Sequence, residues 1–409
     1  MNTGFTNAKS NIDSRTGWKD VKVAMLVRSF SSLGGLELYA YKLIQELLSL
    51  GLHITVICEE CQTDLKHQNL KVVQISPSHK NANKVAKIEH YIKEFSAAIQ
   101  KHGPFDIVHS QHLGAHNVDV VTFHNHTVTR LNECGTSFES ILNKLKLLLR
   151  PDYIMRDEID AMLVKEAQVL IFPSRICKQD FVERFQFHKK QNMAALTVAY
   201  PGWQLASGTH AAENNSAQYL GNGSVAKEKT IIFVGRGYRK KGLDVLLSAC
   251  LLLKQQKYNF KLLIAGLKEK PLDKWQLSTF GLTENVKYLG FVNDMEKVYQ
   301  SGSIIALPSR IEPFGMAALQ AMSYGLVPVV SKVSGVAEIL QNDIDAQIIE
   351  NHLDSKELAK HLATLLDDTD KLKRMSEAAK DKAQSVSWQS TVEATLNAYQ
   401  QVFQKQYVI

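Results

Sequence analysis

The sequence predicts an α/β fold with two doubly wound domains, and three observations support this. Short runs of apolar, often β-branched residues alternate with longer segments whose apolar residues recur at helical spacing, in both halves of the chain. The 409 residues, 45% of them hydrophobic, can bury two cores of ordinary domain size. A stretch rich in Gly, Ser, Ala and Asn at 204–228 separates the halves and is typical of a linker.

Domain boundaries follow from changes in composition. The polar residues 1–19 predict a disordered leader with little to bury. We assign 20–203 to a first domain, 204–228 to the linker and 229–386 to a second domain. The final segment, 387–409, has apolar residues at helical spacing and predicts an amphipathic helix.

Composition and charge exclude several classes of protein. Polar residues interrupt every apolar run well before the ~20 residues that a membrane span needs. The chain starts without the apolar core of a signal peptide, so we expect a cytoplasmic protein. The formal charge of +7 suits acidic partners such as nucleotide phosphates or anionic lipid. We expect no nucleic-acid partner, because zinc-finger, aromatic and basic-helix patterns are missing from the sequence.

The cysteines predict neither a disulfide framework nor a metal site. Five cysteines are an odd number and are widely scattered. Cys58 and Cys61 form a C-x2-C pair, but the sequence offers no second Cys/His pair to complete a tetrahedral zinc site. Two reduced thiols are the favoured interpretation, with a redox or zinc role as the alternative.

A strand, a glycine loop and a helix open the first domain. The apolar run 21–27 predicts a buried strand and 36–50 predicts a helix, with Gly34 and Gly35 just before the helix. Two glycines at a helix start expose backbone N–H groups to a ligand, and phosphate is the usual one. A simple tight turn is the alternative for such a pair.

The rest of the first domain continues this alternation and places a histidine after one strand. The predicted elements are a helix at 84–101 and strands at 54–58, 72–75, 106–109, 118–123, 169–173 and 196–200. His124 follows the strand 118–123, and open α/β sheets bind ligands at the carboxyl ends of strands. His109 and His126 lie at similar places, and we interpret them as satisfied polar groups.

Residues 140–156 combine Leu and Ile with Lys144, Lys146, Arg150 and Arg156. An apolar face edged by cations is typical of a segment that lies on an anionic membrane. A core helix with a solvated side is the alternative.

The second domain opens with a strand at 230–234, a basic loop and a helix that continues to residue 253. The loop contains Arg236 and Lys241, and a glycine-bearing loop before a helix is suited to phosphate, here with fixed cations in addition. A basic surface turn is the alternative. The remaining predicted elements are strands at 260–265 and 286–291 and charged helices within 356–383.

One stretch of the second domain carries a carboxylate between a strand and a helix. The strand 304–307 is followed by Glu312 in a loop, then by Gly315 at the start of a helix at 316–324, and Gly325 ends that helix before the strand 326–330. Bare N–H groups at the helix start form a potential anion site. An ordinary βαβ unit with a surface Glu is the alternative.

The run Glu-Pro-Phe-Gly, followed by a helix of small residues, resembles the E-x7-E signature of the retaining, nucleotide-sugar-dependent glycosyltransferases of family 4. In that family the first Glu faces the donor sugar and the second binds the ribose hydroxyls. The two positions fall on Glu312 and on residue 320, where this sequence has Gln320. The resemblance implies the GT-B fold, in which two Rossmann-like domains face a central cleft and a C-terminal helix crosses back to the first domain.

Other motifs extend the resemblance over both halves of the chain. Gly34 and Gly35 resemble the family's N-terminal glycine loop, near the donor phosphates, and His124 resembles its active-site His. The family's G-R-x4-K-G run, whose Arg and Lys contact the diphosphate, falls on Arg236 and Lys241. The resemblance also places three neighbours of Glu312 at the donor, namely Phe314, Gly315 and Met316.

The resemblance implies transfer of a hexose from a nucleotide sugar, a UDP-sugar more than a GDP-sugar, to a glycan or glycolipid. Similarity is greatest to lipopolysaccharide core glucosyltransferases, which implies a cell-envelope acceptor and a peripheral place on the inner face of the membrane. The nucleotide sugar is a substrate, and we expect no cofactor and no metal. Gln320 leaves two alternatives open, a non-catalytic sugar-nucleotide or glycan-binding protein and a sugar phosphorylase.

Overall fold

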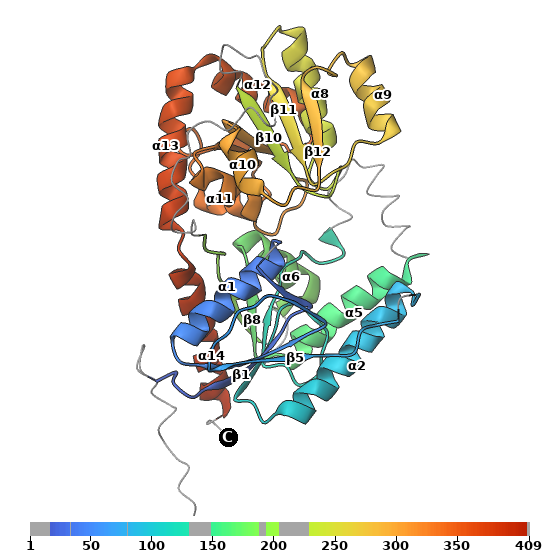
Figure 1. The fold of residues 1–409 in the computed structure, drawn as a ribbon, viewed down its shortest axis with the longest axis vertical. Helices are drawn as coiled ribbons and strands as arrows, with labels where there is room; N and C mark the ends of the chain where they lie inside the picture. The colour runs from blue at the N-terminus through green and yellow to red at the C-terminus, as the bar shows by residue number, and fades with distance from the viewer. Residues whose placement is uncertain are drawn as a thin grey trace, which may run out of the picture. The chain divides into compact units, whose positions relative to one another are not determined.

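The computed structural model describes residues 17–32, 34–79, 81–130, 149–187, 194–203 and 229–406. The chain divides into two compact units (Figure 1). Unit 1 combines the chain up to Gly202 with the C-terminal segment from Trp388, and unit 2 is Trp203–Ser387. The predicted linker 204–228 lies outside the described residues.

Parallel strands form the main sheet of unit 1. They are β1 (Lys22–Leu26), β3 (His53–Cys58), β5 (Leu70–Gln74), β6 (Ile107–Ser110), β7 (Val120–Thr122), β8 (Val169–Phe172) and β9 (Ala195–Val198). Their order in the sheet is β5-β3-β1-β6-β7-β8-β9. Two short strands, β2 (Ser29–Ser31) and β4 (Glu60–Gln62), pair with each other beside it.

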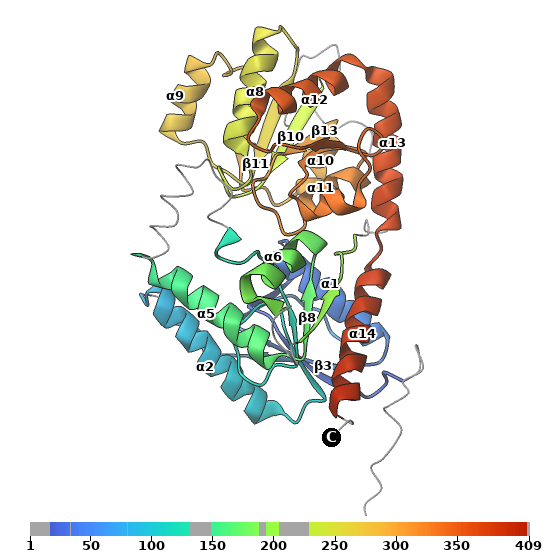
Figure 2. The same cartoon turned by 180° about the vertical axis from the view of Figure 1, so that it is seen from behind.

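Helices cover both faces of this sheet, because successive residues of a strand point to opposite sides. Val23 and Met25 of β1 share a core with α1 (Leu36–Ser49) and with α14 (Trp388–Gln406), the C-terminal helix. The other face packs on α2 (Lys84–His102), α5 (Pro151–Glu166) and α6 (Arg175–Phe185). The central strands are therefore rich in apolar residues, whereas the edge strand β5 is partly exposed. Helices α2 and α5 lie side by side (Figures 1 and 2).

Trp18 corrects the prediction that residues 1–19 are a disordered leader. Its side chain is buried in the core of unit 1, where its ring lies 6.2 Å from the rings of both Tyr399 and Phe403. A single indole buries a large apolar area and can order the polar residues beside it. Residues 1–16 lie outside the described part of the chain.

Unit 2 contains a second parallel sheet. Its strands are β10 (Thr230–Val234), β11 (Lys261–Ala265), β12 (Val286–Gly290), β13 (Ile304–Leu307), β14 (Val327–Ser331) and β15 (Gln347–Ile349), in the order β12-β11-β10-β13-β14-β15. The helices are α8 (Leu243–Gln255), α9 (Pro271–Thr279), α10 (Met295–Gln300), α11 (Met316–Ser323), η2 (Gly335–Ile339), α12 (Ser355–Asp367) and α13 (Thr369–Ser385). Helix α12 packs on α8, and α11 packs on α13.

The strand order reverses direction once in each sheet. In unit 1 the chain goes from β1 to β3 on one side and later places β6 on the other side of β1. In unit 2, β10 has β11 on one side and β13 on the other. Loops diverge at the carboxyl ends of such strands and leave a crevice where ligands bind. The fold thus places the loops after β1, β6, β10 and β13 at the candidate sites.

The predicted fold class is confirmed, and most differences concern short elements. The exception is the 16-residue helix α5, which begins within 140–156, where a core helix was only the alternative interpretation. The strand predicted at 118–123 is shorter, since β7 spans Val120–Thr122. The sequence analysis did not identify the three-residue strands β2, β4 and β15 or the short helices α9 and α10. Elements of this length contain too few residues for a period of 2.0 or 3.6 to show.

Replacing Gly242 is expected to destabilise unit 2. Gly242 precedes α8 with φ of 74°, a left-handed conformation, and an added Cβ would overlap the carbonyl oxygen of Pro308. Gly242→Ala should lower the free energy of unfolding by about 2–5 kcal/mol, the sum of backbone strain and overpacking. Urea denaturation followed by circular dichroism measures this change.

Gly281→Ala is the matched control. Gly281 also has a left-handed φ, of 65°, but an added Cβ would have no atom within 4 Å. Only the backbone strain of about 1–2 kcal/mol should remain. Equal losses in the two variants would show that the contact with Pro308 does not constrain the loop.

Candidate functional site

Two loops of unit 2 meet at the point where its strand order reverses. Residues 235–242 connect β10 to α8, and residues 308–315 connect β13 to α11. The backbone N–H of Arg310 donates to the carbonyl oxygen of Lys240 at 3.0 Å, which joins the loops directly. The residues of the second domain that were predicted to bind the donor lie in these two loops or on α11. They are Arg236, Lys241, Glu312, Phe314, Gly315, Met316 and Gln320.

The structure brings Lys241 and Glu312 into an ion pair, between Nζ and Oε2. Both side chains are largely buried, with 24% of Lys241 and 11% of Glu312 exposed. An ammonium group has three N–H donors and Glu312 uses one, so Lys241 can bind a second anion without leaving Glu312. A Cβ on Gly235 would lie 3.1 Å from Cγ of Lys241, so glycine makes room for this side chain.

Arg310 and Asp244 brace the same loops and were not identified from the sequence. The guanidinium group donates to both carboxylate oxygens of Asp244, at 2.7 and 2.6 Å, and also to the carbonyl oxygen of Arg239. Arg310 is buried, and a bidentate pair of this kind fixes geometry strongly. The one available signal was an Arg just after the strand-ending Pro308.

Gly315 is the N-cap residue of α11, at the helix start as predicted. Its φ is 112°, and it provides no side-chain cap. A Cβ at this position would lie 3.2 Å from Oγ of Ser334 and from Cγ1 of Val336, so the chain passes too closely for another residue. The first turn of α11 therefore presents backbone N–H groups of positive potential. Met316, the first residue of the helix, is partly buried.

Phe314 differs from the other predicted donor-binding residues because its side chain is buried in unit 2, with 3% exposed. Its carbonyl oxygen accepts hydrogen bonds from Oγ of Ser334 at 3.1 Å and from the backbone N–H of Val336 at 2.6 Å. The residue thus fixes the loop before α11 by packing and through its backbone.

Gln320 lies on α11 beside Tyr299, and the tyrosine hydroxyl donates to Oε1 of Gln320 at 3.2 Å. Burial raises the pKa of Tyr299, so its hydroxyl keeps its proton and remains a donor. The ring of Tyr299 also stacks on that of Tyr324, with centroids 5.6 Å apart. The amide nitrogen, Nε2, can donate to a ligand, and Oε1 keeps a second lone pair that can accept from one.

Arg236 extends from the loop after β10 as an exposed side chain. Its guanidinium carbon lies 5.5 Å from the ring centroid of Phe291, a cation–π contact. Phe291 follows β12 and is itself 67% exposed. A cation and an aromatic face are therefore accessible together at the carboxyl edge of this sheet.

In unit 1 the glycine loop precedes α1 as predicted. Gly35 is the N-cap residue and makes no side-chain cap, and an added Cβ there would have no atom within 4 Å. Gly34 has φ of 105°, and an added Cβ would overlap Oε2 of Glu37. The open space at Gly35 leaves the helix start accessible to a ligand.

His124 follows β7 and is partly buried. Its Nε2 lies 2.8 Å from Oε1 of Gln111, and its ring meets Tyr39 edge-on at 4.9 Å between centroids. Burial, with smaller contributions from His112 and His109, lowers the pKa of His124 to about 3. His124 is therefore neutral at physiological pH, and its contact with Gln111 was not predicted from the sequence.

His109 is a satisfied polar group, in agreement with the sequence interpretation, whereas His126 is only partly satisfied, because its buried Nε2 has no hydrogen-bond partner among the described residues. His109 is fully buried between the hydroxyls of Tyr399 and Thr122, at 2.8 and 2.7 Å, and burial lowers its pKa to about 3. Nδ1 of His126 lies 3.0 Å from Asp180, which also accepts from the backbone of the next residue.

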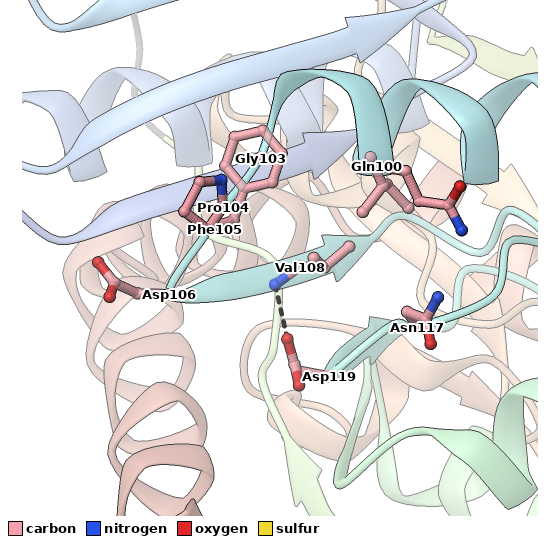
Figure 3. Close-up of a pocket in the computed structure, with 9 residues that line it drawn as sticks. Gln100, Gly103, Pro104, Phe105, Asp106, Val108, Asn117 and Asp119 are labelled. Carbon is pink, nitrogen blue, oxygen red and sulfur yellow. Dashed lines mark hydrogen bonds between the residues drawn. The ribbon is translucent and has the colours of Figure 1, made fainter.

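A surface depression of about 540 Å³ lies at the opposite, amino-terminal edge of the unit 1 sheet (Figure 3). Two carboxylates line it, and both are already hydrogen-bonded to strand N–H groups. Asp119 accepts from Val108 at 2.9 Å and Asp106 accepts from Lys22 at 2.9 Å. Asp106 directly precedes β6 and Asp119 directly precedes β7, so we assign the depression a structural role.

The described residues include no group of three or more His, Cys, Asp or Glu side chains that could hold a metal ion. Cys58 and Cys61 are free thiols, and burial raises the pKa of Cys58 to about 12. No helix among the described residues is both long and apolar enough to cross a membrane.

Most of the predicted membrane segment, 140–148, lies outside the described residues. Beyond it, Leu149 and Ile154 are exposed, at 79% and 47%. Arg150 pairs with Asp152 at 2.8 Å, and Pro151 begins α5. Two apolar side chains beside a cation thus remain on the surface.

Two family models match the chain in sequence. Residues 33–202 match the model described as Glycosyltransferase Family 4, and residues 221–382 match the model described as Glycosyl transferases group 1. The matched ranges contain the glycine loop, His124, Arg236, Lys241 and the Glu312 stretch.

Curated relatives carry related names. An uncharacterised glycosyltransferase of Methanocaldococcus jannaschii is 34% identical over 179 residues, which is 42% of this chain and 45% of that protein, less than half its length. A D-inositol 3-phosphate glycosyltransferase of Corynebacterium kroppenstedtii is 26% identical over 403 residues, 91% of this chain and 86% of that one.

Solved structures share the fold. WaaG, a glycosyltransferase involved in lipopolysaccharide biosynthesis, superposes with a TM-score of 0.71 at 18% identity over 91% of this chain and 99% of its own. Anabaena HepE in complex with UDP and glucose superposes with a TM-score of 0.64 at 17% identity. The match covers 95% of this chain and 100% of the HepE chain. Matched models in both halves, the named relatives and the shared architecture together show that this chain belongs to the GT-B glycosyltransferases of the family 4 type.

Proposed function

We propose that this chain is a retaining, metal-independent hexosyltransferase. Its donor is a nucleotide sugar of the UDP-glucose type, and its acceptor is a cell-envelope glycan or a lipid-linked saccharide such as lipopolysaccharide core. The observation that carries the proposal is the Lys241–Glu312 ion pair at the strand reversal of unit 2. It holds an ammonium group and a carboxylate together at the place where such sheets bind ligands.

The unit 2 loops provide what a departing nucleoside diphosphate needs. When the bond between the anomeric carbon and the phosphate oxygen breaks, negative charge grows on the diphosphate and must be met by donors already in place. Lys241, Arg236 and the N–H groups after Gly315 are suited to this, because two are cations and the third is a helix start. This set supplies the stabilisation for which many transferases use a metal ion.

Retention follows from the geometry that we propose for the attack. The acceptor hydroxyl oxygen bonds to the anomeric carbon on the face from which the diphosphate leaves, and the hydroxyl proton passes to the departing diphosphate oxygen. Glu312 and His124 hold the donor sugar, Glu312 as a carboxylate and His124 as a neutral imidazole. Gly34 and Gly35 add backbone N–H groups from the start of α1.

The comparisons guide the choice of substrates. The HepE structure contains UDP and glucose, which supports UDP over GDP, and WaaG is named for lipopolysaccharide biosynthesis. Several relatives are named for D-inositol 3-phosphate, which is therefore a second acceptor to test. We place the reaction at the inner face of the cytoplasmic membrane, with residues 140–156 in contact with anionic lipid.

Release of nucleoside diphosphate tests the proposed function. We expect UDP release from UDP-glucose to require an acceptor, supplied as lipid extract or D-inositol 3-phosphate, and to be unchanged by EDTA. Tight UDP binding without release would favour the binding protein, and a requirement for free phosphate would favour the phosphorylase. Inversion of the anomeric configuration in the product would contradict the proposed attack.

Lys241→Ala should lose nearly all transfer. Removing a charged contact to the leaving group typically lowers kcat by ~10²–10³-fold. Initial rates of UDP release with acceptor measure the loss, and urea denaturation shows whether the variant is folded. Lys274→Ala, which removes an exposed lysine from α9, is the control and should keep the wild-type rate. Turnover near wild type in Lys241→Ala would reject the role of this lysine.

Gln320→Glu should strengthen UDP binding. A carboxylate would accept from the hydroxyl of Tyr299 and from a ribose hydroxyl together, and a charged acceptor is roughly twice as strong as a neutral one. We expect Kd for UDP to fall roughly fivefold, measured by calorimetry.

Gln276→Glu is a closely matched control for this change. The hydroxyl of Tyr238 donates to Oε1 of Gln276 at 3.2 Å, the same arrangement as Tyr299 with Gln320. This variant adds the same charge to unit 2 outside the proposed ribose site. Because Tyr238 belongs to the loop 235–242, the added charge repels the diphosphate, so the Kd for UDP should not fall as it does in Gln320→Glu. Weaker UDP binding in Gln320→Glu would show that the amide is the better ribose contact.

A further inference from the structure

Two consecutive residues of the loop after β6 hold His124 from two directions. Oε1 of Gln111 lies 2.8 Å from Nε2 of the His124 ring, and Nδ1 of His112 lies 3.4 Å from the His124 backbone nitrogen. The loops after β6 and β7 are therefore joined through both the ring and the main chain of His124. Gln111 is 1% exposed, so its amide is fixed by its surroundings.

The orientation of the Gln111 amide follows from its other neighbour. Nε2 of Gln111 lies 3.2 Å from Sδ of Met25, and a thioether sulfur can accept a hydrogen bond but has no proton to give. The amide nitrogen must therefore face Met25, and the amide oxygen must face His124. An amide oxygen only accepts, so Nε2 of His124 carries the proton.

A chain of hydrogen bonds continues from Gln111 to the C-terminal helix. The Gln111 amide nitrogen also lies 3.3 Å from Nε2 of His109. The same Nε2 accepts a hydrogen bond from the hydroxyl of Thr122 at 2.7 Å. Nδ1 of His109 then donates to the hydroxyl of Tyr399 on α14, at 2.8 Å. The four residues of this hydrogen-bond network, Gln111, His109, Thr122 and Tyr399, each have less than 2% of their surface exposed. The network is therefore shielded from water and holds one arrangement.

A second anchor orients His112. Nε2 of His112 lies 2.8 Å from Oδ1 of Asp160 on α5, and both side chains are largely buried. The Asp160 carboxylate accepts a hydrogen bond from Nε2–H of His112. The lone pair on Nδ1 of His112 is then free to accept from the backbone N–H of His124. The main chain at His124 is thus tied to α5, while its ring is tied to α14.

Among the residues that the structure describes, the groups that face the His124 ring are His109, His112, Gln111 and Tyr39, and none of these is a carboxylate. The ring is therefore neutral as well as oriented. A neutral imidazole with its proton on Nε2 has a lone pair on Nδ1, which can accept a hydrogen bond but cannot donate one.

We propose that Gln111 is a positioning residue that fixes His124 as the Nε2–H tautomer, so that Nδ1 accepts a hydrogen bond from a hydroxyl group of the donor sugar. The inference rests on the proposed function, because it assigns the donor sugar to His124. It also specifies the ligand chemistry at this point. The donor must present an O–H here, and a deoxy or fluoro group at the contacted carbon should bind more weakly.

Nitrogen-15 spectroscopy of the intact protein tests the tautomer without relying on activity. Protein labelled at histidine gives long-range proton–nitrogen correlations that distinguish the protonated ring nitrogen from the bare one, and His124→Asn identifies the His124 signals by their loss. We expect wild-type His124 to be neutral with the proton on Nε2 from about pH 5 to pH 8. A proton on Nδ1, or an imidazolium at neutral pH, would overturn the inference.

Two substitutions of Gln111 then connect the tautomer to turnover. Gln111→Leu removes the acceptor, so His124 should show mixed tautomers and kcat/KM for the donor should fall on the order of tenfold. Gln111→Glu places a carboxylate at Nε2 and raises the pKa of His124. Since the protonated ring cannot accept from a hydroxyl, activity in that variant should fall as the pH is lowered through the raised pKa, whereas the wild type should not show this step.

Gln179→Glu is the control, because Gln179 lies on α6 and is hydrogen-bonded to Glu183 at 2.8 Å, outside the network. It should keep the wild-type pH profile and His124 signals. A merely structural role for Gln111 would lower kcat equally at all pH values and leave the tautomer unchanged, which would contradict the proposal. If the wild type shows the expected tautomer but releases no UDP, the proposed function fails while the tautomer assignment stands.

Discussion

The ion pair between Lys241 and Glu312 is the interaction on which the unit 2 site depends. Breaking a buried pair by removing one partner typically costs about 3–5 kcal/mol, so such pairs need a surrounding structure that holds both charges. The strand reversal supplies the two loops, and the Arg310–Asp244 pair supplies their brace. Gly235 and Gly242 allow the backbone to come close enough for the contact.

Unit 1 has the same strand reversal, but uncharged side chains surround its candidate residue His124 where unit 2 has an ion pair. The side chains linked to the His124 ring are neutral, namely the imidazole of His109, the amide of Gln111 and the hydroxyls of Thr122 and Tyr399, while the Asp160 carboxylate contacts His112. Burial favours the uncharged form of each imidazole. Cations suit a leaving diphosphate, and neutral acceptors suit sugar hydroxyls, so the two chemical tasks that we propose are assigned to two different environments.

Local sequence patterns predicted much of the fold and part of the candidate site. The alternation of strands and helices, the helix start at Gly315 and the helix end at Gly325 are encoded within a few residues, and the structure has all three. Contacts between distant residues were not predictable in this way. Arg310 lies 66 residues from Asp244, and His109 lies 290 residues from Tyr399. Phe314 was placed at the donor because of its motif, yet its ring belongs to the core, since a motif does not specify which atoms of a residue face a ligand.

Gln320 shows how one distant residue changes the meaning of a motif. Substituting Gln for Glu looks like the loss of a charge, but Tyr299, 21 residues earlier, donates to Oε1 and so directs the amide nitrogen away from itself. The amide can donate through Nε2 and can still accept through the second lone pair of Oε1. Ribose hydroxyls can serve as either partner, so the amide offers the ribose that we propose here both a donor and an acceptor. The departure from the family signature is therefore compatible with a working donor site.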